Sequence, residues 1–151
     1  MRKQINSIFV YLFFIACWIF FFYFYPYHLH YKEQITLCVL QPDFLQTYLQ
    51  KPAFLTEICG DYLTQFFLWT GGGSSILTLT FVFTWLGLRI ALRKTGITSH
   101  VSLWALLPIV AEWALSCHLE YPLSMSLGLM YSVWAFSLST LSTSTHTRGI
   151  L

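Results

Sequence analysis

Charged residues are scarce in this chain. Only 9% of its 151 residues are charged, against about 25% in an average soluble protein. Eight Lys and Arg and six Asp and Glu leave a formal net charge of +2, and these residues are scattered. A nucleic-acid-binding surface needs clustered basic residues, and an acidic or basic tail needs a run of like charges. Both are therefore excluded, and no nucleic-acid partner is expected.

The motifs of common soluble enzymes are also missing. The three consecutive glycines, Gly71 to Gly73, lack the Lys and Ser/Thr of a phosphate-binding loop and lie among apolar residues. There is no nucleophile elbow, HExxH motif or dinucleotide fingerprint, and no internal repeat of the kind that builds inverted-repeat transporters. No cofactor is therefore expected.

The four cysteines do not form a metal-binding pattern. They are Cys17, Cys38, Cys59 and Cys117, and none lies in a CxxC pair. Two of them lie in apolar runs, where a thiol behaves as a small hydrophobic group. Cys38 and Cys59 share the one long polar segment, so a disulfide between them remains an alternative to two free thiols.

What the chain has in abundance is apolar sequence: 56% of its residues are hydrophobic and 19% aromatic. Residues 8–25 form a run of eighteen without a charge, which as a helix covers about 27 Å. Because Arg2 and Lys3 precede it, a cleaved signal peptide is the competing interpretation. The run continues well past Cys17 and has no small-x-small cleavage site, which favours an uncleaved span.

Three further apolar runs follow, so the sequence predicts an all-α integral membrane bundle of about four transmembrane helices with interfacial amphipathic helices. In the second run, three glycines disfavour a continuous helix. We expect an interfacial helix that ends near Trp69 and a span that starts near Ser74, the alternative being one long tilted helix. The predicted segments are a tail at 1–7, spans at 8–25, 63–92, 101–117 and 123–141, an interfacial helical segment at 26–62, and a tail at 142–151.

The basic residues predict the orientation. Six of the eight fall on one side of this arrangement, namely Arg2, Lys3, Arg89, Arg93, Lys94 and Arg148. By the positive-inside rule that side is cytoplasmic. We therefore expect a multi-pass protein of the inner (plasma) membrane with both termini in the cytoplasm and residues 26–62 outside it.

The polar segment at 26–62 contains helix-start signals at Pro42 with Asp43 and at Pro52 with Glu57. It is expected to form short helices that lie in the membrane interface. The alternative is a substrate-facing surface, in which each of the acidic residues Glu33, Asp43, Glu57 and Asp61 is a weak catalytic candidate as a general base, and the sequence does not select among them.

His28 and His30 are weak metal-binding candidates, together with a nearby carboxylate. In a helix, side chains two residues apart point about 200° apart and do not converge on one ion. No metal is therefore expected, and interfacial histidines are the favoured interpretation.

Glu112 lies inside the third apolar run. A carboxylate within a span costs about 2.5–3.5 kcal/mol, which makes it a candidate functional residue. The favoured interpretation is structural, either pairing with a hydroxyl on a neighbouring span or reaching the interface beside His118 and Glu120. The alternative is a substrate, proton or ion role.

In the fourth run, small residues recur every four positions, at Ser124, Gly128 and Ser132. Such a face lets helices approach closely, so packing within the bundle is expected, with a homodimer interface as the alternative.

Several short motifs resemble a known family. They are YPYHLHYKEQ at 25–34, Lys51-Pro52, and YLTQFF at 62–67, which leads into the second span. Over about the first 90 residues the chain resembles the N-terminal part of an uncharacterised bacterial family of polytopic membrane proteins, known only as a domain of unknown function. Members of that family are longer, with further spans and a helical soluble region, so the resemblance implies a truncated or split member.

The layout is also similar to lipid-linked sugar transferases of the GT-C class, whose first outer loop carries interfacial helices and an acidic catalytic residue. That resemblance implies Glu33 or Asp43 as the catalytic position, although the paired acidic motif of such enzymes is missing.

The function that these features favour is a structural or accessory membrane subunit, or the membrane part of a larger protein. The alternatives are an N-terminal fragment of a sugar transferase and a small transporter or channel subunit centred on Glu112. The expected partners are the lipid bilayer and other membrane subunits or a second copy of the chain. An enzymatic activity of this chain alone is not expected.

Overall fold

A computed structural model describes residues 2–35, 46, 48–97 and 99–148, with the side chains at 2–5, 35 and 141–148 outside the description. Within these residues the structure is all-α and contains no strand, which confirms the all-α part of the predicted fold class. The elements are α1 (Arg2–Tyr23), α2 (Pro26–Ile35), α4 (Phe54–Thr64), the 3₁₀ helix η1 (Gln65–Leu68), α5 (Gly72–Lys94), α6 (Val101–Trp104), α7 (Leu106–Ser116) and α8 (Leu123–Arg148).

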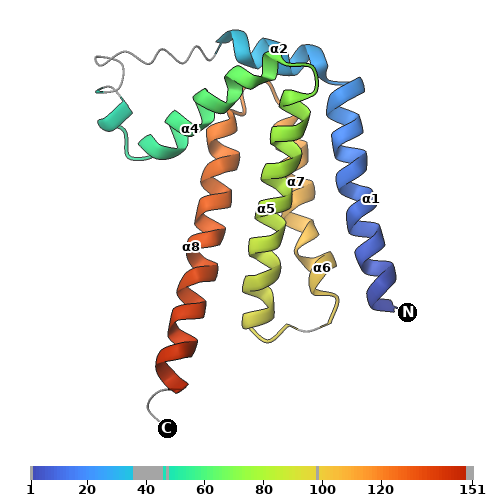
Figure 1. The fold of residues 1–151 in the computed structure, drawn as a ribbon, viewed down its shortest axis with the longest axis vertical. Helices are drawn as coiled ribbons and strands as arrows, with labels where there is room; N and C mark the ends of the chain where they lie inside the picture. Colours follow the sequence, from blue (N-terminus) through green and yellow to red (C-terminus); the bar gives the residue numbers. More distant parts are fainter. Residues whose placement is uncertain (1, 36–45, 47, 98, 149–151) are drawn as a thin grey trace.

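The long helices form a bundle that is closed at one end by two helices lying across it. Helices α1, α5 and α8 and the α6–α7 pair run side by side along the long axis, whereas α2 and α4 cross one end of the bundle (Figure 1). The start of α1, the α5–α6 turn and the far end of α8 lie at the opposite end. Helix α5 packs against α1, α7 and α8 and is the centre of the bundle.

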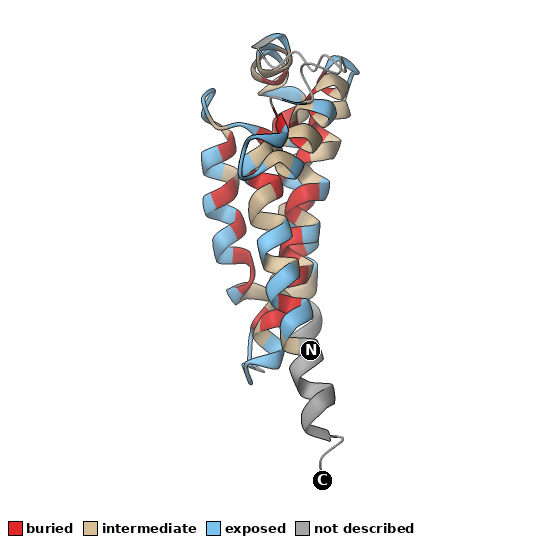
Figure 2. Ribbon diagram, turned by 90° about the vertical axis from the view of Figure 1, so that its left-hand side faces the viewer, coloured by how far each residue is buried: buried red, intermediate tan, exposed pale blue. Residues whose placement is uncertain are grey.

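Helix α1 is apolar on both its buried and its exposed faces. Val10, Phe14 and Phe21 are buried on one face, where the Phe14 ring meets the Trp85 ring of α5 edge-to-face at 5.8 Å between centroids. The opposite face is equally apolar, yet it is exposed, with Leu12 58% accessible. In the side view of Figure 2 the buried residues follow the inner faces of the helices and the exposed ones the outside. A helix that is apolar all round belongs in a protein core or in lipid.

Two of the described helices are long and apolar enough to cross a bilayer, at Asn6–Tyr23 and Gly72–Lys94. These correspond to the first predicted span and to the second half of the second. The third predicted span, 101–117, forms a shorter apolar stretch, Val101–Ser116, rather than a helix of full spanning length. The fourth lies in α8, whose many serines and threonines lower its hydropathy.

The third apolar run is interrupted at Ala105, which separates α6 from α7. Pro108 lies in the first turn of α7 and has no N–H to donate to the carbonyl of Trp104. Its ring also crowds that carbonyl, so a continuous helix through this point is disfavoured. Proline in a first turn costs little, which explains why the break falls just before it.

The glycine run produces a break, as in the expectation of an interfacial helix followed by a span. The helical path of α4 and η1 ends at Leu68, and α5 begins at Gly72. Gly71 adopts a left-handed conformation with φ of 81°, which glycine adopts without steric cost. A side chain at Gly72 would collide with the carbonyl oxygen of Phe66. Glycine is therefore required where the chain turns from the crossing helix into the bundle.

Candidate functional site

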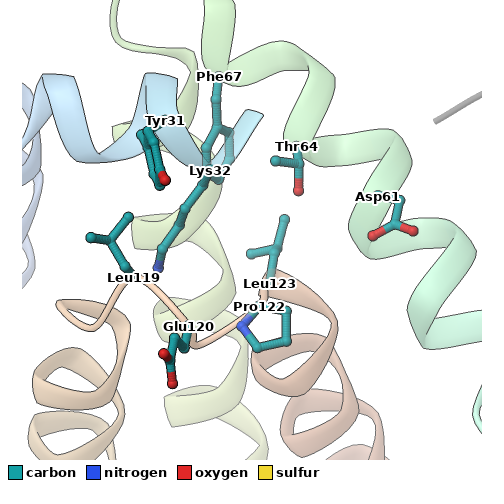
Figure 3. A pocket seen from close by; sticks show the side chains of 9 residues that line it. All are labelled: Tyr31, Lys32, Asp61, Thr64, Phe67, Leu119, Glu120, Pro122 and Leu123. Carbon is teal, nitrogen blue, oxygen red and sulfur yellow. The ribbon is translucent and has the colours of Figure 1, made fainter. Parts of the chain in front are cut away.

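Polar side chains converge where α2, α4 and η1 meet the turn between α7 and α8. A cavity of about 420 Å³ lies there. Its lining residues are Tyr31, Lys32, Asp61, Thr64, Phe67, Leu119, Glu120, Pro122 and Leu123 (Figure 3). The two crossing helices and the bundle thus form a cavity whose wall contains both polar and apolar side chains.

Lys32 fastens α2 to the α7–α8 turn. In Figure 3 its side chain extends from α2 toward this turn, and its ammonium group donates to the carbonyl oxygens of Ser116 and Tyr121, both at 3.0 Å. Ser116 is the last residue of α7, so Lys32 places a cation where the helix dipole is negative and satisfies a terminal carbonyl. Burial lowers the pKa of Lys32. These bonds indicate that Lys32 organises the site.

The carboxylates of the cavity are partnered or exposed. Asp61 accepts a hydrogen bond from the hydroxyl of Tyr48, and Glu120 is exposed at the rim. Outside the cavity, Glu57 forms an ion pair with Lys51 at 2.5 Å. The cavity therefore combines one cation with two carboxylates, and it does not present a single strong charge to a ligand.

Glu112 lies next to this cavity and is only 4% exposed. Its carboxylate accepts hydrogen bonds from the hydroxyls of Ser126 on α8, at 2.5 Å, and Tyr121 in the turn, at 3.1 and 3.3 Å. Burial, followed by the nearby charge of Glu112, raises the pKa of Tyr121 to about 12, so its phenol remains a donor at neutral pH. This arrangement joins α7, α8 and their turn, as expected if Glu112 has a structural role.

Of the two weak catalytic candidates, Glu33 and Asp43, the structure describes only Glu33. Glu33 is half-buried on α2, next to Lys32, but it does not line the cavity. Asp43 lies outside the described residues, and so does Cys38. Cys59, the candidate disulfide partner of Cys38, carries a free thiol. Neither catalytic assignment is tested by this geometry.

The two weak metal candidates, His28 and His30, lie on helix α2, where side chains two residues apart diverge. The His28 ring packs against Tyr25 with 4.7 Å between centroids, whereas His30 lines a separate cavity beside Gly71. Among the residues that the structure describes, no group of three His, Cys, Asp or Glu side chains is placed to hold a metal ion.

The three residues of the predicted small-residue face on α8, Ser124, Gly128 and Ser132, lie in different environments. Ser124 meets α4 at Gly60, where an added Cβ would lie 2.8 Å from the Ser124 backbone nitrogen. A Cβ added at Gly128 would lie 3.9 Å from the side chain of Thr56, which is an ordinary van der Waals distance. The Ser132 hydroxyl donates to the carbonyl of Gly128 on its own helix.

The second close approach is at Gly87 of α5, where an added Cβ would lie 2.8 Å from Val133. Ser137 of α8 donates to the Gly87 carbonyl at 2.9 Å. Neither Gly60 nor Gly87 was among the predicted packing residues. The small residues of α5 at Thr80, Thr84 and Ala91, which share the buried face with Gly87, are the sequence signal that could have identified the second one.

These features define a class: an all-α protein with two helices of membrane-spanning length, capped at one end by crossing helices over a cavity of mixed polar and apolar lining. The chain belongs to a family of unknown function, DUF6057, whose family model matches residues 1–151. A resemblance to a family of unknown function is thus confirmed, and the match extends over the whole chain rather than over about the first 90 residues. No curated protein matches the chain significantly, and neither does any solved structure.

Proposed function

We propose that this chain is a four-span integral membrane protein with α2 and α4 in the outer interface, and that it serves as a structural or accessory membrane subunit or the membrane part of a larger assembly. The observation that carries the proposal is the exposed apolar surface along the bundle. Large hydrophobic side chains on the outer faces of α1, α5, α7 and α8 are exposed, including Leu12, Phe83, Leu107 and Leu138.

Such a surface is unfavourable in water, because soluble proteins rarely expose apolar patches of more than a few hundred Å². In hydrocarbon the same side chains are solvated by lipid, and the helices satisfy their own backbone hydrogen bonds. Helices α1, α5 and α8 and the α6–α7 pair run side by side, which supports four crossings. The interruption at Ala105 is buried against neighbouring helices. Buried hydroxyls in these helices, such as Thr84 and Ser137, donate to carbonyls of the preceding turn.

The polar site supports a structural function rather than transport. Glu112 is engaged by two hydroxyls and is buried. Lys32 lines the cavity, but its ammonium group donates to two backbone carbonyls. Glu112 and Lys32 therefore both join helices together. A subunit in which Glu112 and Lys32 stabilise the helix packing is suited to act as a scaffold for other membrane proteins.

Cysteine accessibility in intact cells tests this topology. In a background with the four native cysteines replaced, Leu119→Cys reports on the α7–α8 turn and Ser99→Cys on the α5–α6 turn. We expect a membrane-impermeant maleimide to label Leu119→Cys in intact cells and Ser99→Cys only after permeabilisation. Tyr27→Cys, at the start of α2, is the matched control and should behave as Leu119→Cys. Labelling of both turns from the same side, or extraction of the chain by alkaline carbonate, would contradict the four-span arrangement.

A further inference from the structure

A second cavity, of about 430 Å³, lies at the end of the bundle opposite the crossing helices. Three elements form it: the start of α1, the last turns of α5 and the start of α6. The lining residues are Asn6, Ser7, Arg89, Arg93, His100, Val101 and Ser102. The α5–α6 turn, which carries His100, marks this end of the molecule in Figure 1.

The cavity is basic and has no carboxylate in its wall. Arg89 and Arg93 are one helical turn apart on α5, so both guanidinium groups lie on the same side of that helix. All six acidic residues of the chain lie at 33, 43, 57, 61, 112 and 120, far along the sequence from both arginines. In the described parts of the chain the ion pair is Lys51–Glu57, which lies beside the crossing helix α4. The two positive charges are thus left without an acidic partner among the described residues.

Arg89 is held in place rather than extended into solvent. Its guanidinium carbon lies 5.2 Å from the centre of the Trp85 ring, and the Trp85 indole is itself fixed by a hydrogen bond to the carbonyl of Ser102 at 3.0 Å. The Nε atom of Arg89 is buried and has no hydrogen-bond partner among the residues that the structure describes. A buried donor without an acceptor is unfavourable, and a bound anion would satisfy it.

The remaining polar groups of the wall are suited to the same ligand. The side-chain amide of Asn6 lies 3.0 Å from Nδ1 of His100, which fixes both side chains at the cavity. Ser102 adds a hydroxyl. Two guanidinium groups surrounded by amide, imidazole and hydroxyl groups match the oxygens of a phosphate, because a guanidinium group donates two parallel hydrogen bonds to such a group.

We propose that this cavity binds the phosphate group of an anion, supplied either by an anionic phospholipid of the cytoplasmic leaflet or by a soluble phosphate compound. The lipid source rests on the four-span arrangement proposed above, which places this end at the cytoplasmic surface. Basic pockets between helices at that surface are typical sites for anionic head groups.

Ligand binding to the purified full-length chain in dodecyl maltoside tests the proposal. Tryptophan fluorescence, to which Trp85 beside Arg89 contributes as one of six tryptophans, is followed during titration with short-chain phosphatidylglycerol, phosphatidylcholine of equal chain length, or inorganic phosphate. Sodium chloride of matched ionic strength is the salt control. We expect saturable binding of phosphatidylglycerol, of inorganic phosphate or of both, and no saturable change with net-neutral phosphatidylcholine or sodium chloride. Whichever of the two anions binds identifies the source.

Substitutions decide whether the binding belongs to this cavity. Arg89→Gln and Arg93→Gln are each expected to weaken binding about fivefold, since each removes one cation near the anion. Lys94→Gln removes the same charge from an exposed side chain next to Arg93 that does not line the cavity, and it should leave the affinity unchanged. If Arg89→Gln disturbs folding through Trp85, the exposed Arg93→Gln still gives the answer.

The proposal is overturned if neither anion binds, or if all three variants bind as the unchanged chain does. Binding in detergent does not depend on orientation in a membrane. If the chain binds phosphate but both turns are labelled from the same side, the four-span arrangement is refuted and the site is retained. If the labelling is as expected but neither anion binds, the site alone is refuted.

Discussion

At the scale of single residues, the most consequential contact is that of Glu112. A carboxylate inside an apolar bundle is tolerated only when its oxygens are hydrogen-bonded. Ser126 and Tyr121 supply those bonds from the next helix and from the turn. The residue that looked most like a transport site in the sequence therefore lies in a contact between helices.

Replacing Glu112 by glutamine is expected to change thermal stability little, because the amide oxygen still accepts from Ser126. Glu112→Ala leaves the buried hydroxyl of Ser126 and the partly buried hydroxyl of Tyr121 without this acceptor, which costs about 1–3 kcal/mol. Unfolding of the purified protein in detergent, followed by circular dichroism, measures both variants. Glu33→Gln, on α2 and outside the cavity, is the control and should be neutral. A stable Glu112→Ala protein would remove the structural role and return Glu112 to the candidate transport residues.

At the scale of helices, two glycines allow α4 and α5 to approach α8 closely. Neither glycine belongs to the predicted small-residue face of α8. Gly60 of α4 touches the backbone of α8 at Ser124, and Gly87 of α5 touches Val133. Gly128, on the predicted face, has room for a methyl group. The spacing of small residues along one helix indicates a contact face, but the partner helix decides which of those small residues makes the contact.

Gly60→Ala and Gly128→Ala form a matched pair that tests this difference. The alanine at 60 meets backbone atoms of Ser124, which cannot move aside as a side chain can, so we expect a loss of about 1–3 kcal/mol. The alanine at 128 meets no obstacle, and its higher helix propensity favours stability by up to about 1 kcal/mol. Thermal unfolding in detergent compares the two. Equal destabilisation by both would show that Gly128 also lies in a tight interface, for example with a second copy of the chain.

At the scale of the whole molecule, the crossing helices and the bundle form one unit because Lys32 links them. Its two hydrogen bonds join α2 to the end of α7 and to the turn before α8, more than eighty residues away in the sequence. Among the described side chains at this end, Lys51 is the other lysine, and it pairs with Glu57 at the surface.

Lys32→Met should loosen α2 from the bundle, since methionine retains much of the apolar stem but donates no hydrogen bond. We expect a loss of stability of about 2 kcal/mol and faster hydrogen exchange at 26–35. Hydrogen–deuterium exchange with mass spectrometry detects this locally. Lys51→Met removes an exposed ion pair worth about 0–1 kcal/mol and is the control. Unchanged exchange at 26–35 in Lys32→Met would mean that the apolar contacts of α2, such as buried Leu29, hold it without Lys32.

Much of the fold could be predicted from local sequence. Apolar runs and sparse charge indicate helices for a membrane, Gly71 to Gly73 indicate a break, and Pro52 with Glu57 indicates the start of the helix at Phe54. Each of these signals acts through neighbouring residues, by backbone conformation or by the helix dipole. The interruption at Ala105 was missed, although Pro108 was visible, because a proline can also be accommodated within a membrane helix by neighbouring groups.

The sequence by itself thus determined the all-α class, the apolar runs and the turn into α5, since composition and short-range sterics suffice for them. Only the tertiary structure decided that Glu112 meets Ser126, that Lys32 binds the end of α7, that Gly60 is the close contact of Ser124, and that Arg89 and Arg93 share a cavity with Asn6 and His100. These contacts join residues from different helices. Their formation depends on how the helices pack and rotate against one another, which no local pattern specifies.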